Sequence, residues 1–84
     1  HNITINNRKE IEISGITDIG SYNDEEIEIN TICGLIYLCG KNLSILNLDV
    51  NEGNIKIIGS IDSIYYTDKD DNSTKGLFSR IFKQ

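Results

Sequence analysis

The side chains that could carry out chemistry in this sequence are few, and most of them are acids. The only histidine is His1, so a Ser or Cys nucleophile has no imidazole base elsewhere in the chain, and we give His1 itself no chemical role. Phosphate-binding loops of the GxxxxGK or GxGxxG type do not occur. Glu10 with Glu12 and Glu26 with Glu28 are paired carboxylates, but they alternate along predicted strands, where a solvated face explains them. We predict that the protein is not an enzyme and uses no cofactor.

The two cysteines, Cys33 and Cys39, are six positions apart, which is neither a metal-ligand spacing nor a redox CxxC motif. On one extended strand they would share a face about 20 Å apart, too far for a disulfide. We expect both to be buried free thiols in a reducing compartment.

An acidic segment near the C-terminus, DKDDNSTKGLFS at 68–79, partly matches a calcium-binding loop. Asp68, Asp70 and Asn72 take the first, third and fifth positions of an EF-hand. Ser73 replaces the glycine of the sixth position, and Ser79 replaces the glutamate of the twelfth. A soluble linker is the better interpretation, and we predict no metal site.

The last ten residues, KGLFSRIFKQ at 75–84 (the tail), differ from the chain before them. Residues 1–74 carry five basic and thirteen acidic side chains, whereas the tail has three cations and no acid. On a helix its large apolar side chains would form one stripe, with the cations around the remaining face. The apolar stripe is Leu77, Phe78, Ile81 and Phe82, and the cations are Lys75, Arg80 and Lys83.

Such a short amphipathic helix is not stable alone in water. Burying four large side chains gives about 6 to 12 kcal/mol. Ordering the segment costs about 1.5 kcal/mol per residue, so the two contributions nearly cancel. We therefore predict that the tail docks reversibly on an anionic membrane surface, on a partner's groove or on its own β domain.

The rest of the chain favours β-structure. Of its 84 residues, seventeen are isoleucine, and Ala and Pro are absent, so β-branched side chains dominate the apolar set. The net charge of −5 argues against a nucleic-acid partner. The longest apolar run, ICGLIYLC at 32–39, is far below the roughly 20 residues that cross a bilayer.

Alternating apolar and polar residues predict strands with one wet face at EIEISGI (10–16) and EEIEIN (25–30). TICGLIYLCG (31–40) is apolar on both faces, which indicates a central strand covered on both sides. Further strands are expected at LSILNL, NIKII and SIDSIYY, residues 43–48, 54–58 and 60–66.

Several glycines are spaced nineteen residues apart, among them Gly40 and Gly59. This spacing fits a small meander or sandwich with strands of similar length, or coils of a short β-solenoid, and we favour the former. We predict an all-β fold class with a short C-terminal amphipathic helix. We expect a β domain at 1–66, a polar linker at 67–74 and the tail at 75–84.

The order of these motifs resembles the YabP/YqfC sporulation protein family. The segment TICGLIYLCGKNLSILNLDVNEGNIKIIGSIDSIYY is similar to the family core, a glycine followed by G-K-x-L, N-L and G-x-I-x-S-I-x-Y. The matching places are Gly34, Gly40 to Leu43, Asn47, Leu48, Gly59, Ile61, Ser63, Ile64 and Tyr65. RKEIEISGI (8–16) also fits, and the LFSRIFK ending resembles YabP more than YqfC.

The resemblance implies a mother-cell protein of an endospore-forming bacterium that helps to build the spore envelope, coat or cortex, with no active site to transfer. It also implies that the glycines are turn and bulge positions and that GKNL is a turn with Lys41 on the surface.

We expect a non-enzymatic scaffold in the mother-cell cytoplasm, held peripherally at the outer forespore membrane surface by the tail. Other spore-envelope or mother-cell proteins are the expected partners, and strand edges could pair identical copies. The alternative is a binding module for a glycan or small envelope precursor, lined by Tyr37 with Tyr65 or Tyr66. Adjacent tyrosines on a strand point to opposite faces, so only one of the latter two can take part.

Overall fold

The computed structural model describes residues 1–67 of the chain, which form a single antiparallel sheet of six strands and contain no helix. The strands are β1 (Ile3–Asn6), β2 (Glu10–Ser14), β3 (Ile16–Tyr22), β4 (Glu26–Thr31), β5 (Gly34–Asp49) and β6 (Asn54–Thr67). Their order is β1-β2-β6-β5-β4-β3. The predicted all-β class is confirmed, and the expected C-terminal helix lies outside the described residues.

Strands β3 to β6 form a meander, and β2 then pairs with β6, so the β1–β2 hairpin extends the sheet on that side. All the paired strands run antiparallel, which agrees with the meander and not with the stacked coils of a solenoid. The linker and tail predicted at 67–74 and 75–84 lie outside the description apart from Thr67, the last residue of β6.

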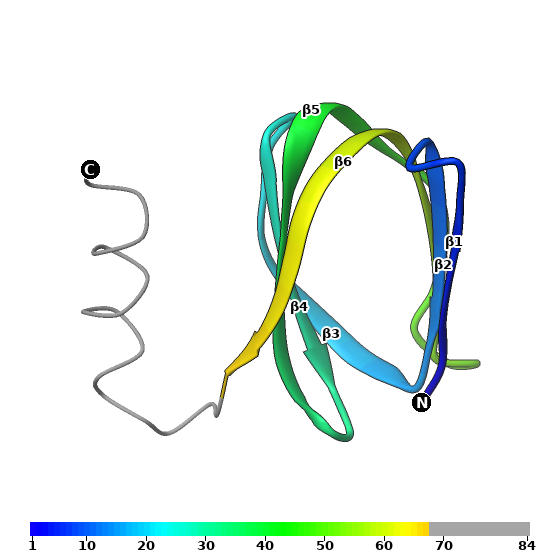
Figure 1. Cartoon of the computed structure of the whole chain (residues 1–84). Coiled ribbons are helices and arrows are strands. Elements are labelled where there is room, and N and C mark those ends of the chain that lie inside the picture. Colours follow the sequence, from blue (N-terminus) through cyan, green and yellow to red (C-terminus); the bar gives the residue numbers. More distant parts are fainter. Residues whose placement is uncertain (68–84) are drawn as a thin grey trace.

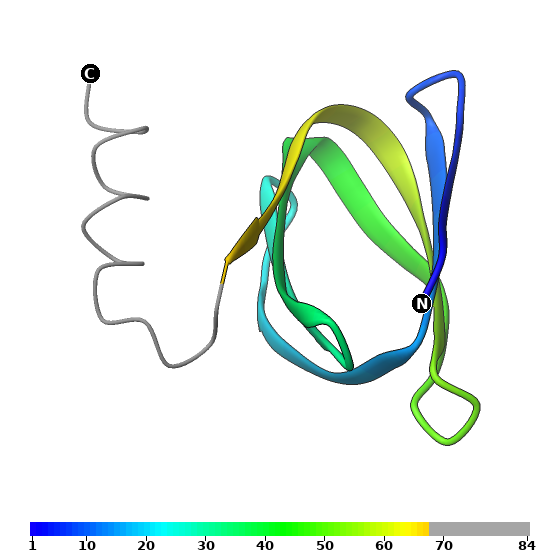
Figure 2. The same ribbon diagram turned by 60° about the horizontal axis from the view of Figure 1, so that its bottom comes forward.

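The sheet folds over on itself because β5 and β6 are long and bend near their middles (Figures 1 and 2). Residues 54–58 of β6 pair with β2 and with residues 44–49 of β5, and together with β1 they form one layer, the β2 layer. Residues 61–67 of β6 pair with residues 35–40 of β5, which in turn pair with β4, and these form the β4 layer. β3 pairs with β4 and crosses between the two layers (Figures 1 and 2).

Glycine permits both bends because the two strands approach each other closely there. Gly59 has φ of +139°, and a Cβ on it would lie 2.7 Å from the Asn42 carbonyl oxygen. A Cβ on Gly40 would overlap the Ser60 carbonyl oxygen. The nineteen-residue spacing thus marks paired bends. The prediction that separate strands end at Gly40 and Gly59 is wrong, because β5 and β6 continue through these residues. GKNL is a bulged bend within β5 and not a turn, although Lys41 is exposed as expected.

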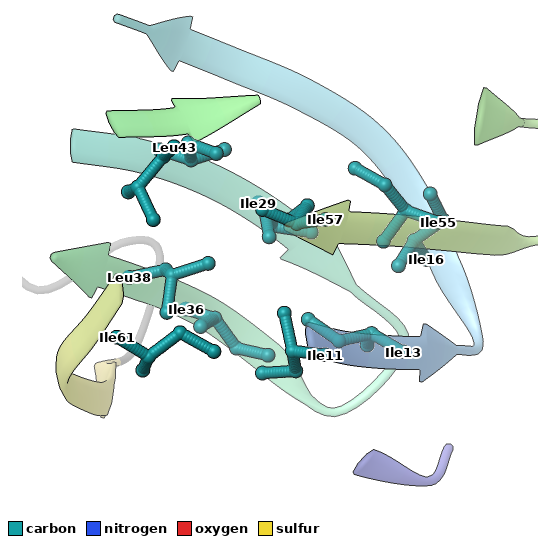
Figure 3. Packing of buried hydrophobic residues seen from close by; sticks show 11 residues of the cluster. Ile11, Ile13, Ile16, Ile29, Ile36, Leu38, Leu43, Ile55, Ile57 and Ile61 are labelled. Carbon is teal, nitrogen blue, oxygen red and sulfur yellow. The ribbon is translucent and has the colours of Figure 1, made fainter. Parts of the chain in front are cut away.

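The core lies between the two layers, where isoleucines from both point toward one another (Figure 3). The period-two pattern predicted this correctly for β2 and β4, because Ile11, Ile13, Ile27 and Ile29 are buried while the glutamates between them are not. The whole cluster is Ile11, Ile13, Ile16, Ile27, Ile29, Ile36, Leu38, Leu43, Ile55, Ile57 and Ile61.

Two hairpin turns cap the bends. The β1–β2 turn offers backbone oxygens of Arg8 and Lys9, which accept hydrogen bonds from the N–H groups of Ile61 and Gly59 at 2.9 and 3.0 Å. The β3–β4 turn pairs with the bend of β5 in the same way. The backbone oxygens of Asp24 and Glu25 accept hydrogen bonds from the N–H groups of Leu43 and Gly40, respectively. Four backbone N–H groups at the bends are therefore paired by these turns.

Candidate functional site

The outward surface of the β4 layer carries an apolar centre with acidic neighbours, and we name it the outer face. It is formed by three residues from each of β4, β5 and β6: Glu26, Glu28, Asn30, Leu35, Tyr37, Cys39, Ser63, Tyr65 and Thr67. Alternation along β5 sets these positions apart from Ile36 and Leu38, which point into the core. Leu35 and Cys39 retain only 6% and 8% of their exposure although they face away from the core.

Tyr37 and Tyr65 are cross-strand partners at the middle of the outer face, and Glu28 lies on the other side of Tyr37. The pKa of Tyr37 is raised, first because of burial and then because the negative charges of Glu28 and Glu26 disfavour the phenolate. The face therefore combines aromatic surface with negative potential.

The two cysteines are free and lie in different environments. Cys39 is on the outer face, where burial, Glu26 and Asp62 raise the pKa of its thiol against the opposing effect of a hydrogen bond with Ser63. Cys33 is in the turn between β4 and β5 and is exposed. The prediction of free thiols is confirmed, but the prediction that Cys33 is buried is wrong because the chain turns before β5 begins.

The first carboxylate pair is solvated, as its alternation suggested. Glu10 and Glu12 flank Lys56, whose Nζ lies 3.1 Å from Glu10 Oε2 and 3.4 Å from Glu12 Oε2. The hydrogen bond from Lys56, followed by its charge, lowers the pKa of Glu10. Glu12 and Lys56 line a groove of about 470 Å³ on the outer surface of the β2 layer, together with Asn2, Asn47 and Asn54.

His1 has a structural role that the sequence did not indicate. Its Nδ1 lies 2.7 Å from the Ser14 carbonyl oxygen, and its Nε2 lies 2.6 Å from the Tyr66 hydroxyl. The rings of His1 and Tyr66 meet edge to face. Tyr66 pairs with the core residue Ile36, so it lies on the face opposite Tyr65, as expected for adjacent tyrosines.

The docking residues predicted from sequence all lie outside the described residues, and the structure neither places them nor brings them together. They are Lys75, Leu77, Phe78, Arg80, Ile81, Phe82 and Lys83. The calcium-loop match at 68–79 lies outside as well. Within residues 1–67, no group of three or more His, Cys, Asp or Glu side chains could hold a metal ion. The same part of the chain contains no helix suited to crossing a membrane.

Sequence analysis reached the outer face only through Tyr37 and Tyr65, in the alternative of a binding module, and the structure makes these two residues cross-strand partners. The other residues of the face were missed, although one signal pointed to them. The run at 31–40 was predicted to be covered on both sides, and in β5 residues of both alternating sets are shielded: Ile36 and Leu38 by the core, Leu35 and Cys39 on the outer face. The sequence could not show which strands would flank this run.

These features define the class as a small all-β domain built from one folded sheet, with a polar outer surface on one layer and an apolar, acidic one on the other. Comparisons with known proteins give the family. The YabP family matches residues 1–73. The chain is also 36% identical over 84 residues to the spore protein YabP of Bacillus subtilis (strain 168), covering 99% of this chain and 84% of that protein. The chain belongs to the YabP family, as the sequence motifs indicated.

Proposed function

We propose that this protein acts in sporulation as a non-enzymatic interaction module for assembly of the spore envelope. The observation that carries the proposal is family membership together with a relative named as a spore protein. The described surface agrees with it, because the paired carboxylates of Glu10 and Glu12 lie on a solvated strand face and are held by Lys56. Such a surface suits recognition by another molecule better than bond making.

The proposed attachment point is the tail, residues 75–84. Its apolar stripe would enter the interface of the outer forespore membrane from the mother-cell side, and Lys75, Arg80 and Lys83 would meet anionic headgroups at about 1 kcal/mol each. The body of the domain is acidic, so it would be repelled by the same headgroups. The tail would therefore hold the domain beside the membrane and not in it.

Strand edges offer a second kind of contact, with other envelope or mother-cell proteins or with identical copies. β1 and β3 are the two ends of the sheet order among the described strands. β1 is short and displays Ile5 with 47% of its surface exposed, whereas β3 has two register shifts that disturb its edge. Strand addition is thus favoured at β1.

Vesicle sedimentation tests the attachment. The full-length protein should sediment with vesicles that contain phosphatidylglycerol and remain in solution with vesicles of phosphatidylcholine alone. L77S/F78S/I81S/F82S should abolish binding, and K75E/R80E/K83E should weaken it and remove its dependence on salt. The matched control is Leu46→Ser, which removes an exposed apolar side chain of β5 and should bind normally. Equal binding by all variants would refute the role of the tail.

Binding of a glycan or small precursor is a second candidate, favoured by the Tyr37–Tyr65 pair on the outer face. Tyr65→Ala would then abolish function while the tail variant retained it. The reverse result supports attachment through the tail.

A further inference from the structure

The two outward surfaces of the domain differ in how far they are shielded. On the β2 layer, the outward residues Thr4, Glu12 and Asn47 are exposed, and even Ile58 keeps 38% of its exposure. On the outer face of the β4 layer, Leu35 and Cys39 are buried. A wet sheet face normally carries polar residues at such central positions.

No strand within residues 1–67 lies over the outer face. The strands of this part of the chain contact one another mainly as sheet neighbours. Both ribbon views show the β4 layer with the β2 layer on one side only (Figures 1 and 2). The side chains that flank Leu35 across the strands, Asn30 and Thr67, are short. An apolar cover from elsewhere would complete this surface.

We propose that residues 75–84 of the same chain dock on the outer face and cover it with their apolar stripe. This goes beyond the proposed function, because it needs no membrane. It assigns the outer face as an intramolecular docking surface, and it selects one occupant for that surface.

The point where the chain leaves the sheet favours this occupant. Thr67 is itself on the outer face, as the cross-strand partner of Leu35. The face extends four residues back along β6 to Ser63, about 13 Å at the usual strand rise. A helix over the ten tail residues would be about 15 Å long. Residues 68–74 can span up to about 24 Å, which is enough to reverse direction and bring the tail back along the face.

Charge complementarity favours it as well. The nine positions of the outer face include Glu26 and Glu28 and no lysine or arginine. The negative charges of both carboxylates help to raise the pKa of Tyr37 at the centre of the face. The tail carries three cations and no acid, in a chain whose other residues are strongly acidic. A second copy of the acidic domain would be a poorer match for this surface.

Docking on the domain and docking on a membrane use the same four apolar side chains, so they exclude each other. The outer face would keep the apolar stripe out of water until a membrane competes for it. Membrane attachment would then uncover Tyr37 and Tyr65.

The reactivity of Cys39 reports on the cover. Full-length protein is treated with iodoacetamide, and the alkylation of each cysteine is followed by mass spectrometry. Cys33 is exposed in a turn outside the outer face and serves as the internal reference. If the tail covers the face in about nine molecules of ten, iodoacetamide should alkylate Cys39 about tenfold faster in L77S/F78S/I81S/F82S than in the wild type. A tenfold change in rate corresponds to about 1.4 kcal/mol of protection. Leu46→Ser should leave the rate unchanged.

Charge reversal supplies an independent check that leaves the apolar stripe of the tail intact. K75E/R80E/K83E should also speed alkylation of Cys39, and adding Glu28→Lys should slow it again. Urea unfolding of every variant separates a lost cover from global opening. The same Cys39 rate in the wild type and in the stripe variant would overturn the proposal. Protection that depends on protein concentration would overturn it too, because the cover would then come from another molecule.

Vesicles of phosphatidylglycerol link this test to the proposed function. Faster alkylation of Cys39 in their presence would show that the membrane takes the tail from the face. Unchanged protection, with the stripe variant still unprotected, would support docking on the domain and refute membrane attachment.

Discussion

Replacing Gly59 by alanine tests the bent crossing of β5 and β6 on which the two layers depend. Gly59 has φ of +139°, a conformation that costs a residue with a Cβ about 1 to 3 kcal/mol. The new Cβ would lie 2.7 Å from the Asn42 oxygen and 2.9 Å from the Leu43 Cα. Both contacts are with backbone, and relieving them by overpacking costs about 1 to 3 kcal/mol more.

Gly59→Ala should therefore lower the free energy of unfolding by about 2 to 6 kcal/mol. A domain of this size has about 4 to 12 kcal/mol in total, so the variant should be marginal or unfolded at room temperature. Urea unfolding followed by circular dichroism measures the change, with the slope against urea confirming that the transition remains two-state.

Gly20→Ala is the matched control on the exposed strand β3. Its Cβ would meet the end of the Glu28 side chain, at 2.9 Å from the carboxyl carbon, and that flexible side chain can move. The free energy of unfolding should change by no more than about 0.5 kcal/mol. If Gly59→Ala were as mild as Gly20→Ala, the close crossing of β5 and β6 would be refuted.

Three further predictions follow from the core, the ion pairs and the thiols. Ile29→Ala removes a fully buried side chain and should cost about 2 to 5 kcal/mol in urea unfolding, and a loss below about 1 kcal/mol would contradict its place in the core. The pKa of Glu10 is lowered from 4.5, so its contribution to stability is present above pH 4.5 and is lost as the pH falls through the folded pKa. In Lys56→Gln, an NMR titration should find that the Glu10 pKa has returned toward 4.5. An unchanged pKa would exclude Lys56 as the cause of the shift. Cys33 should react with iodoacetamide well before Cys39 in the folded protein, and equal rates would contradict their different exposure and the raised pKa of the Cys39 thiol.

The inward faces of β2 and β4 were predictable because their isoleucines alternate with glutamates, and local alternation alone decides which side is buried. β3 could not be found in the same way. Its sequence ITDIGSY pairs with β4 through two register shifts, which break the period of two. β1 is four residues long and lies at the edge of the sheet, so burial leaves little mark on its sequence.

The continuity of β5 and β6 also escaped sequence analysis. Gly40 and Gly59 interrupt the apolar patterns just as glycines in turns between strands would. They are bends within continuous strands only because β5 and β6 approach each other closely there, and a single sequence does not show that non-local contact. The same limit applies to the outer face. The sequence shows that β5 is apolar on both sides, but Glu28 and Tyr65 come beside Tyr37 only through pairing with β4 and β6.

Placement by the tail is the central claim, and localisation in sporulating cells tests it most directly. Full-length protein with a fluorescent tag at its N-terminus is compared with L77S/F78S/I81S/F82S, at matched abundance. We predict that the wild-type protein forms a ring around the forespore and that the variant spreads through the mother cell. A ring formed equally by both proteins would contradict the claim and would assign placement to the β domain.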